Sequence, residues 1–132
     1  MKRSYHGSCH CGAVRFEAEI DLTAETSRCN CAMCTKTRLW KSVISPSDFH
    51  VLQGEEALTE YQFGKRSIQH LFCRICGAIP YSRGEFEGKP FVAINIASLD
   101  DATDAELAKA PVVFQDGRND AWQREPVETG YL

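Results

Sequence analysis

The sequence predicts a mainly β chain that metal ions help to stabilise, and three observations support this. Residues 13–20 alternate apolar and polar side chains, as a strand with one buried face requires. Residues 90–97 form the most apolar strand pattern of the chain. Seven cysteines fall into three close groups, and an odd number would leave one thiol over in a framework made only of disulfides.

The remaining elements follow from turn residues and short patterns. A serine before a proline predicts one helical turn at 45–49, and the spacing of Thr103 and Glu106 predicts a capping box that opens a short helix. Residues 21–27 are polar and are expected to form a turn. Further short strands are expected at 39–44, 50–53, 58–63, 68–72 and 112–114, with 58–63 and 68–72 paired as a hairpin.

Cys29, Cys31 and Cys34 lie close enough in sequence to meet at one point. We expect residues 28–34 to form a loop, because ligands and polar residues alternate there without a core-facing period. Zinc binds thiolates at about 2.3 Å and prefers four ligands in a tetrahedron, so three cysteines leave one position for water or substrate. This group is therefore the candidate catalytic site.

The other four cysteines suggest a closed structural site. Cys9 and Cys11 form a C-x-C pair, and Cys73 and Cys76 form a C-x-x-C pair followed by glycine. A redox dithiol is the competing interpretation of the second pair, but Pro80 disfavours the helix that a thioredoxin-like site needs. Spacing alone also permits a thiolate-bridged pair of ions, or another division of the seven ligands between sites.

Composition and charge limit the class of protein. The chain has 132 residues, of which 43% are hydrophobic, and this predicts a single domain over residues 1–132. A net charge of −3 argues against nucleic acid as a partner, and Lys36, Arg38 and Lys41 are expected on a solvated face. No apolar run approaches the length of a membrane span. The odd number of cysteines and the lack of an apolar signal region behind the basic residues at the start predict a reducing, cytoplasmic location.

The histidines have mostly structural interpretations. His6 and His50 are expected at the surface, and His10 is expected to point away from any metal between its two flanking ligands. His70 lies on a predicted strand, where it either packs or faces the open zinc position. Met33 is expected to pack rather than to bind metal.

Three motifs, at 7–12, 29–34 and 70–77, together resemble the zinc-domain family of the glutathione-dependent formaldehyde-activating enzyme and centromere protein V. Asn30, the run before Cys73 and the segment 116–122 look closer to the centromere protein V branch. The resemblance implies an Mss4-like, zinc-stabilised β-sheet fold with one or two short helical turns, and two zinc ions per chain. It also implies the ligands: Cys9, Cys11, Cys73 and Cys76 for a structural zinc, and Cys29, Cys31 and Cys34 for a catalytic-type zinc.

The predicted function follows from this resemblance and from the open zinc position. It is that of a carbon–sulfur lyase acting on a glutathione or thiol–aldehyde adduct, similar to an S-hydroxymethylglutathione synthase. Arg28, Lys36 and Arg38 beside the site would balance the two carboxylates of glutathione. The alternative is a non-catalytic zinc module for a protein or chromosomal partner. A fourth protein ligand on the second zinc would remove the lyase mechanism.

Overall fold

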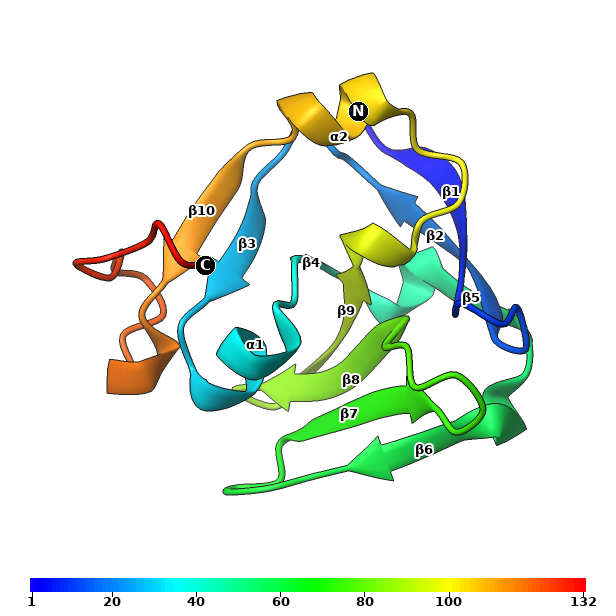
Figure 1. Ribbon diagram of the computed structural model, residues 1–132, viewed down its shortest axis with the longest axis horizontal. Coiled ribbons are helices and arrows are strands. Elements are labelled where there is room, and N and C mark those ends of the chain that lie inside the picture. The colour runs from blue at the N-terminus through cyan, green and yellow to red at the C-terminus, as the bar shows by residue number, and fades with distance from the viewer.

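The computed structural model describes residues 1–132 and confirms a mainly β fold with short helical turns (Figure 1). The strands are β1 (Arg3–Ser8), β2 (Arg15–Ile20), β3 (Thr26–Cys29), β4 (Lys41–Ile44), β5 (Phe49–Gln53), β6 (Leu58–Tyr61), β7 (Ile68–Cys73), β8 (Tyr81–Phe86), β9 (Lys89–Asn95) and β10 (Val112–Gln115). The helices are α1 (Ala32–Thr37) and α2 (Asp104–Lys109), with single turns η1 (Pro46–Asp48), η2 (Glu55–Ala57), η3 (Ile96–Ser98) and η4 (Gly117–Asn119). None of these helices has the length and apolar character that crossing a membrane would need.

The strands form two sheets. The smaller sheet has the order β1-β2-β5, and the larger has the order β10-β3-β4-β9-β8-β7-β6. β10 pairs with β3 in parallel, whereas the other neighbours in both sheets are antiparallel. Since β3 and β10 are distant in sequence, the parallel pair brings residues 112–115 beside residues 26–29, next to α1 (Figure 1).

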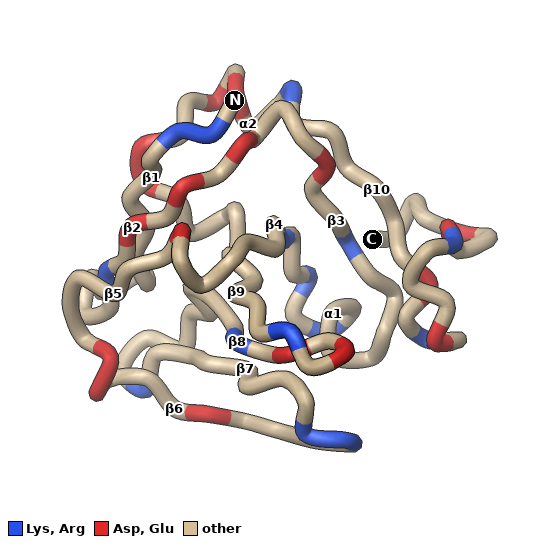
Figure 2. Tube along the Cα trace, turned by 180° about the vertical axis from the view of Figure 1, so that it is seen from behind, with Lys and Arg blue, Asp and Glu red and all other residues tan.

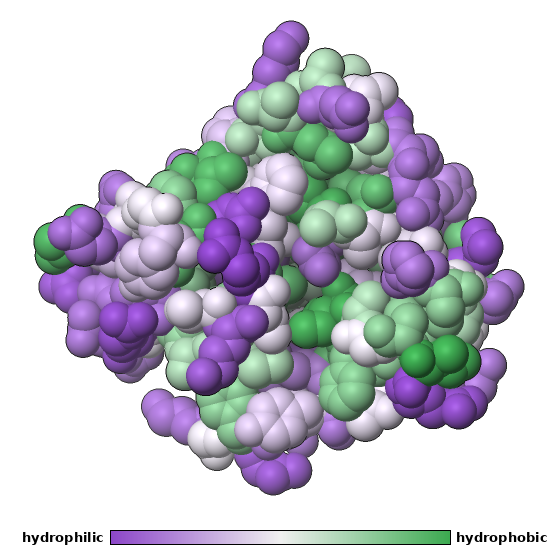
Figure 3. All heavy atoms as spheres, viewed as in Figure 1, coloured by the Kyte–Doolittle hydropathy of each residue, from purple (hydrophilic) through white to green (hydrophobic).

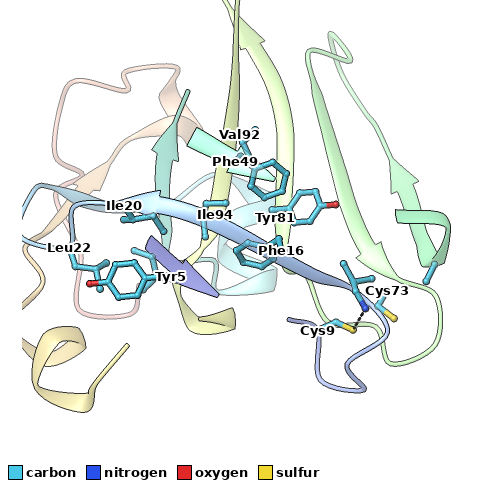
Figure 4. Packing of buried hydrophobic residues seen from close by; sticks show 14 residues of the cluster. Tyr5, Cys9, Phe16, Ile20, Leu22, Phe49, Cys73, Tyr81, Val92 and Ile94 are labelled. Carbon is cyan, nitrogen blue, oxygen red and sulfur yellow. Dashed lines mark hydrogen bonds between the residues drawn. The ribbon is translucent and has the colours of Figure 1, made fainter. Parts of the chain in front are cut away.

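The core lies between the two sheets (Figure 4). Phe16, Ala18 and Ile20 point inward from β2, which confirms the predicted alternation. The ring of Tyr81 from the larger sheet packs edge-on against Phe49, with 4.6 Å between centroids. Cys9 and Cys73 belong to the same buried cluster. One predicted ligand from each of the two cysteine pairs is therefore part of the core.

Local signals explain where several elements begin and end. The side chain of Thr103 accepts a hydrogen bond from the Glu106 backbone N–H, and Glu106 reaches back to complete the predicted capping box. The predicted turn at 45–49 is η1, capped by Ser45. The apolar strand ends at Asn95, two residues earlier than predicted, because the Asn95 side chain accepts from Ala97 and starts a helical turn there.

Two local predictions are wrong. The predicted polar turn at 21–27 contains the start of β3, since Thr26 and Ser27 are buried beside β10. The predicted loop at 28–34 does not exist as such, because Cys29 ends β3 and Cys34 lies in α1. The cause is the Cys31 side chain, which accepts a hydrogen bond from the Cys34 backbone N–H and so acts as an N-cap.

Candidate metal centres

The first cysteine cluster joins the two sheets. Cys9 and Cys11 follow β1, whereas Cys73 ends β7 and Cys76 lies in the next turn. The Sγ atom of Cys11 is 3.6 Å from that of Cys9 and 3.7 Å from that of Cys73. Four sulfurs placed about 2.3 Å from one ion at tetrahedral angles would be about 3.8 Å apart. The four thiols therefore have the spacing that a tetrahedral metal ion requires.

Backbone N–H groups donate to sulfur atoms of this cluster. The backbone N–H of Val14 donates to Cys9 Sγ over 3.3 Å, and Figure 4 shows this bond at the edge of the core. Hydrogen bonds from the backbone of Ala78, and then of Cys11, lower the pKa of Cys76 to about 6. The thiolate form of Cys76 is thus stabilised by the backbone. The pKa of Cys11 is raised to about 11, because the Ala13 backbone, which acts to lower it, is outweighed by burial and the neighbouring thiols.

The second cluster is local in sequence. Cys29 is 1% exposed at the end of β3, Cys31 caps α1, and Cys34 lies in the first turn of that helix. Their Sγ atoms all lie within 4.8 Å of one another, so this cluster could also hold a metal ion. No histidine, aspartate, glutamate or further cysteine joins these three as a fourth ligand. The four-plus-three grouping of the seven cysteines is thus the grouping that the fold brings about.

The three local thiols share hydrogen bonds in a way that favours one thiolate. The Cys31 backbone N–H donates to Cys29 Sγ over 3.3 Å, and the Cys34 backbone N–H donates to Cys31 Sγ over 3.4 Å. Side-chain hydrogen bonds with Cys29, and then with Cys34, lower the pKa of Cys31. Side-chain hydrogen bonds of the Cys34 thiol with Cys29, and then with Cys31, raise the pKa of Cys34. The pKa of Cys31 is therefore lowered and that of Cys34 is raised within the same cluster.

Two arginines lie at this second cluster. Lys and Arg positions lie on β3, around α1 and on β4, while Asp and Glu positions mark β2 (Figure 2). Arg28 and Arg38 line a small cavity together with Cys29 and Cys34. Its volume of about 10 Å³ gives room for roughly one water molecule. Strongly hydrophilic side chains lie beside neutral and weakly hydrophobic ones over the β3 and α1 region in the space-filling view (Figure 3).

Of the three basic residues predicted to bind the substrate, Lys36 does not line this cavity. A fourth basic residue, Lys41, was not predicted to act at the cluster. Lys36 is exposed, although it was predicted to act with Arg28 and Arg38. Lys41, which was expected only on a solvated face, acts electrostatically on Cys34 in the direction that lowers its pKa. Its Nζ atom donates to Gln115 Oε1 over 3.1 Å, which holds the ammonium group between β4 and β10. The sequence signal for Lys41 was only its place in a short basic run.

His70 is the histidine that the fold places near the second cluster. Its ring stacks on Phe63 with 5.3 Å between centroids and an interplanar angle of 16°. Burial lowers the pKa of His70, while the negative charge of Cys31 acts in the opposite direction. The other three histidines, His6, His10 and His50, are exposed, as predicted for His6 and His50.

Comparison with known proteins now decides the family. Residues 4–115 match the family model described as glutathione-dependent formaldehyde-activating enzyme. The chain belongs to this family. A crystal structure of a Rhodobacter sphaeroides protein is similar, with 34% identity, coverage of 82% of this chain and 99% of that one, and a TM-score of 0.70. The resemblance inferred from the motifs is confirmed for the family, whereas the centromere protein V branch stays a prediction.

Proposed function

We propose that this chain is a zinc-dependent carbon–sulfur lyase that makes or breaks the adduct of glutathione with formaldehyde. The observation that carries this proposal is the three-thiol cluster of Cys29, Cys31 and Cys34, which has no fourth protein ligand. Catalytic zinc sites keep a position for water or substrate, and structural sites close all four. Family membership supports the substrate class, because the family is described by glutathione and formaldehyde.

The two clusters would have different roles. We propose that Cys9, Cys11, Cys73 and Cys76 bind a structural zinc, and that Cys29, Cys31 and Cys34 bind the catalytic-type zinc. Thiolate-only donor sets suit zinc, since soft sulfur ligands disfavour magnesium and calcium. A reducing, cytoplasmic location is part of this proposal, because all seven cysteines are free thiols.

The proposed reaction is a thiolate addition. Zinc bound at the three-cysteine cluster would supply the positive charge that keeps the glutathione sulfur a thiolate. That sulfur forms a bond to the formaldehyde carbon, the carbonyl π electrons move to oxygen, and a proton completes the hydroxyl group. Lys41, whose charge acts on Cys34, and the ring N–H of His70, which lies within electrostatic reach of Cys31, are the proposed donors to the developing alkoxide. In the lyase direction the same steps run in reverse.

Arginine side chains would orient the substrate. Arg28 and Arg38 flank Cys29 and Cys34, and guanidinium groups pair well with carboxylates. Arg28 also stacks over Trp40 at 5.1 Å, and Arg38 donates to the Tyr131 carbonyl over 3.2 Å. The cavity that these arginines line is too small for glutathione itself. The proposed contacts with glutathione therefore lie at the opening of the cavity.

Protein purified without chelator is expected to contain two zinc ions per chain. The seven thiols divide into one set of four and one set of three, and each set has the spacing of metal ligands. Elemental analysis of the protein gives the ratio directly. A ratio of one, or titration of seven free thiols in protein that holds two ions, would contradict this division.

Native protein is expected to accelerate exchange between formaldehyde, glutathione and their adduct, and Cys31→Ser is expected to lose most of this acceleration. The reason is that this substitution removes one of the three proposed ligands of the catalytic-type zinc. NMR exchange with labelled formaldehyde measures the rate above the spontaneous reaction. Lys36→Gln is the matched control, because Lys36 is exposed and outside the cavity, and its rate is expected to stay native.

Failure of this test would have a specific meaning. If native protein gives no acceleration and glutathione perturbs no protein signals, the chain is a zinc module that binds a partner rather than an enzyme. Full activity in Cys31→Ser with one zinc lost would instead show that the reaction takes place elsewhere.

A further inference from the structure

Asn30 lies between two of the proposed ligands and is almost fully buried. The residue is 4% exposed. Its Nδ2 atom donates to Asp116 Oδ1 over 2.9 Å, and its Oδ1 atom accepts from the Arg118 backbone N–H over 2.9 Å. Both ends of the amide are therefore engaged by one distant segment, and a buried amide that lost these partners would be costly.

Asp116 anchors the other side of this contact. It is also 4% exposed, and Arg124 Nη2 donates to its Oδ2 atom over 2.9 Å. The side chain of Asn119 donates to both carboxylate oxygens, over 3.0 and 3.2 Å. Donation from Asn119, then Arg124, then Asn30 keeps the pKa of Asp116 far below its usual range. The acceptor of Asn30 is thus a fixed negative charge rather than a mobile surface group.

The same segment touches Cys29. Gln115 pairs with Cys29 at the end of the parallel ladder, and the Asn30 backbone N–H donates to the Gln115 carbonyl over 3.2 Å. At Gly117, a Cβ atom would lie 2.5 Å from Cys29 Sγ and 2.5 Å from the Trp122 ring. Residues 115–118 therefore pack against the turn that carries the first two thiols.

We propose that Asn30 and Asp116 are positioning residues that hold the Cys29–Cys31 turn in the shape in which the three thiols converge. They bind no metal and touch no substrate. They act through Cys29 and Cys31, whose spacing depends on the backbone turn at Asn30. The four-cysteine cluster is built from other loops and does not depend on them. This inference rests on the proposed metal site, but it does not depend on the proposed reaction.

Two isosteric single variants test the pair. Asn30→Asp puts two carboxylates face to face, and Asp116→Asn turns an amide donor toward the donors of Arg124 or Asn30. Each variant is expected to weaken metal binding at the three-cysteine cluster by about 10- to 100-fold, the usual effect of losing an outer partner of a ligand. Co²⁺ titration against a chelator measures both affinities, and thiolate-to-cobalt charge-transfer bands report the geometry at each site.

The exchanged pair, Asn30→Asp with Asp116→Asn, supplies the decisive comparison. The carboxylate introduced at position 30 would accept from the amide introduced at position 116 and from the Arg118 backbone N–H. The contact then re-forms with donor and acceptor reversed, and most of the lost affinity is expected to return. Asp101→Asn is the matched control. Asp101 also accepts from a backbone N–H, over 2.9 Å from His6, but it lies against β1, and its loss should leave the three-cysteine affinity native.

Three outcomes would overturn the proposal. The first is unchanged affinity in both single variants, and the second is an equal loss at the two clusters, which would indicate general destabilisation. The third is an exchanged pair no better than the single variants. If native protein binds only one ion, the rate of Cys29 alkylation, mapped by mass spectrometry, still tests the proposal. Alkylation is expected to be faster in each single variant than in native protein or in the exchanged pair. Loss of catalytic activity alone, with these measurements as expected, would count against the reaction and not against the positioning role.

Discussion

Cys76→Ser is expected to abolish the folded state. Cys11 and Cys73 are 62 positions apart and their Sγ atoms touch, so a metal ion here closes a long loop between the two sheets. Binding of structural zinc contributes about 10 to 16 kcal/mol in small zinc domains, which is comparable to the whole stability of a domain this size. Circular dichroism melts and size-exclusion chromatography are expected to show no cooperative transition and largely aggregated protein.

Cys31→Ser is the matched comparison, and its fold is expected to survive. The three thiols of its cluster come from residues 29–34, so a metal ion there closes almost no loop. Serine is a strong N-cap residue, and it can accept the Cys34 backbone N–H in place of the thiol. A melting temperature within a few degrees of native is the expected result. If both variants lost the same stability, the two clusters would not differ as structural and catalytic sites.

Patterns set by neighbours in sequence were predictable. The alternation of Phe16, Ala18 and Ile20 describes the buried face of β2, and the Thr103–Glu106 spacing describes the start of α2. The hairpin of β6 and β7 likewise follows from two apolar runs around a glycine turn. In each case the interaction that fixes the element lies within a few residues, so its signal is local.

Elements fixed by distant or unusual partners were missed. The first part of α1 was predicted to belong to a loop, because ligands and polar residues alternate over 28–34 without a core-facing period. The helix start was missed because cysteine is not among the common N-cap residues. β1 and β8 were not predicted. β3 was divided between the predicted turn at 21–27 and the predicted loop at 28–34, because its burial depends on β10, which pairs with it in parallel from a distant part of the chain. The contact of Asn30 with Asp116 spans 86 positions, and no single-sequence pattern pairs an amide with a carboxylate so far away.

The division of the cysteines lies between these cases. Spacing predicted three groups, and the fold unites two of them, the pairs at 9–11 and 73–76, into one cluster. The two pairs meet only because the two sheets pack together. The preference of zinc for four ligands had nevertheless already favoured a single four-cysteine site. The Mss4-like assignment and the identity of the metal stay predictions.

Gly54 is the position where one methyl group is expected to do most damage outside the ligands. Its φ angle is +82°, in the left-handed region, and a Cβ atom would lie 1.8 Å from the Ala13 carbonyl oxygen and 3.0 Å from Val14 Cα. Both neighbours are backbone, so no side chain can rotate away. The Val14 backbone N–H donates to Cys9 Sγ, and any shift of residues 13–14 therefore moves a proposed structural ligand.

Gly54→Ala is thus expected to lower the free energy of unfolding by about 4 kcal/mol or more, because backbone must move in addition to the left-handed strain. Gly88→Ala isolates the strain alone. Its φ is +78°, and nothing lies within 4 Å of its Cβ position, so a loss of about 1 to 2 kcal/mol is expected. Urea denaturation with zinc present compares the two midpoints, and zinc release measured in parallel should begin earlier in Gly54→Ala only. Similar losses of unfolding free energy in the two variants would contradict this explanation. They would show that the close approach of Gly54 to residues 13–14 does not connect the Gly54 turn to the four-cysteine cluster.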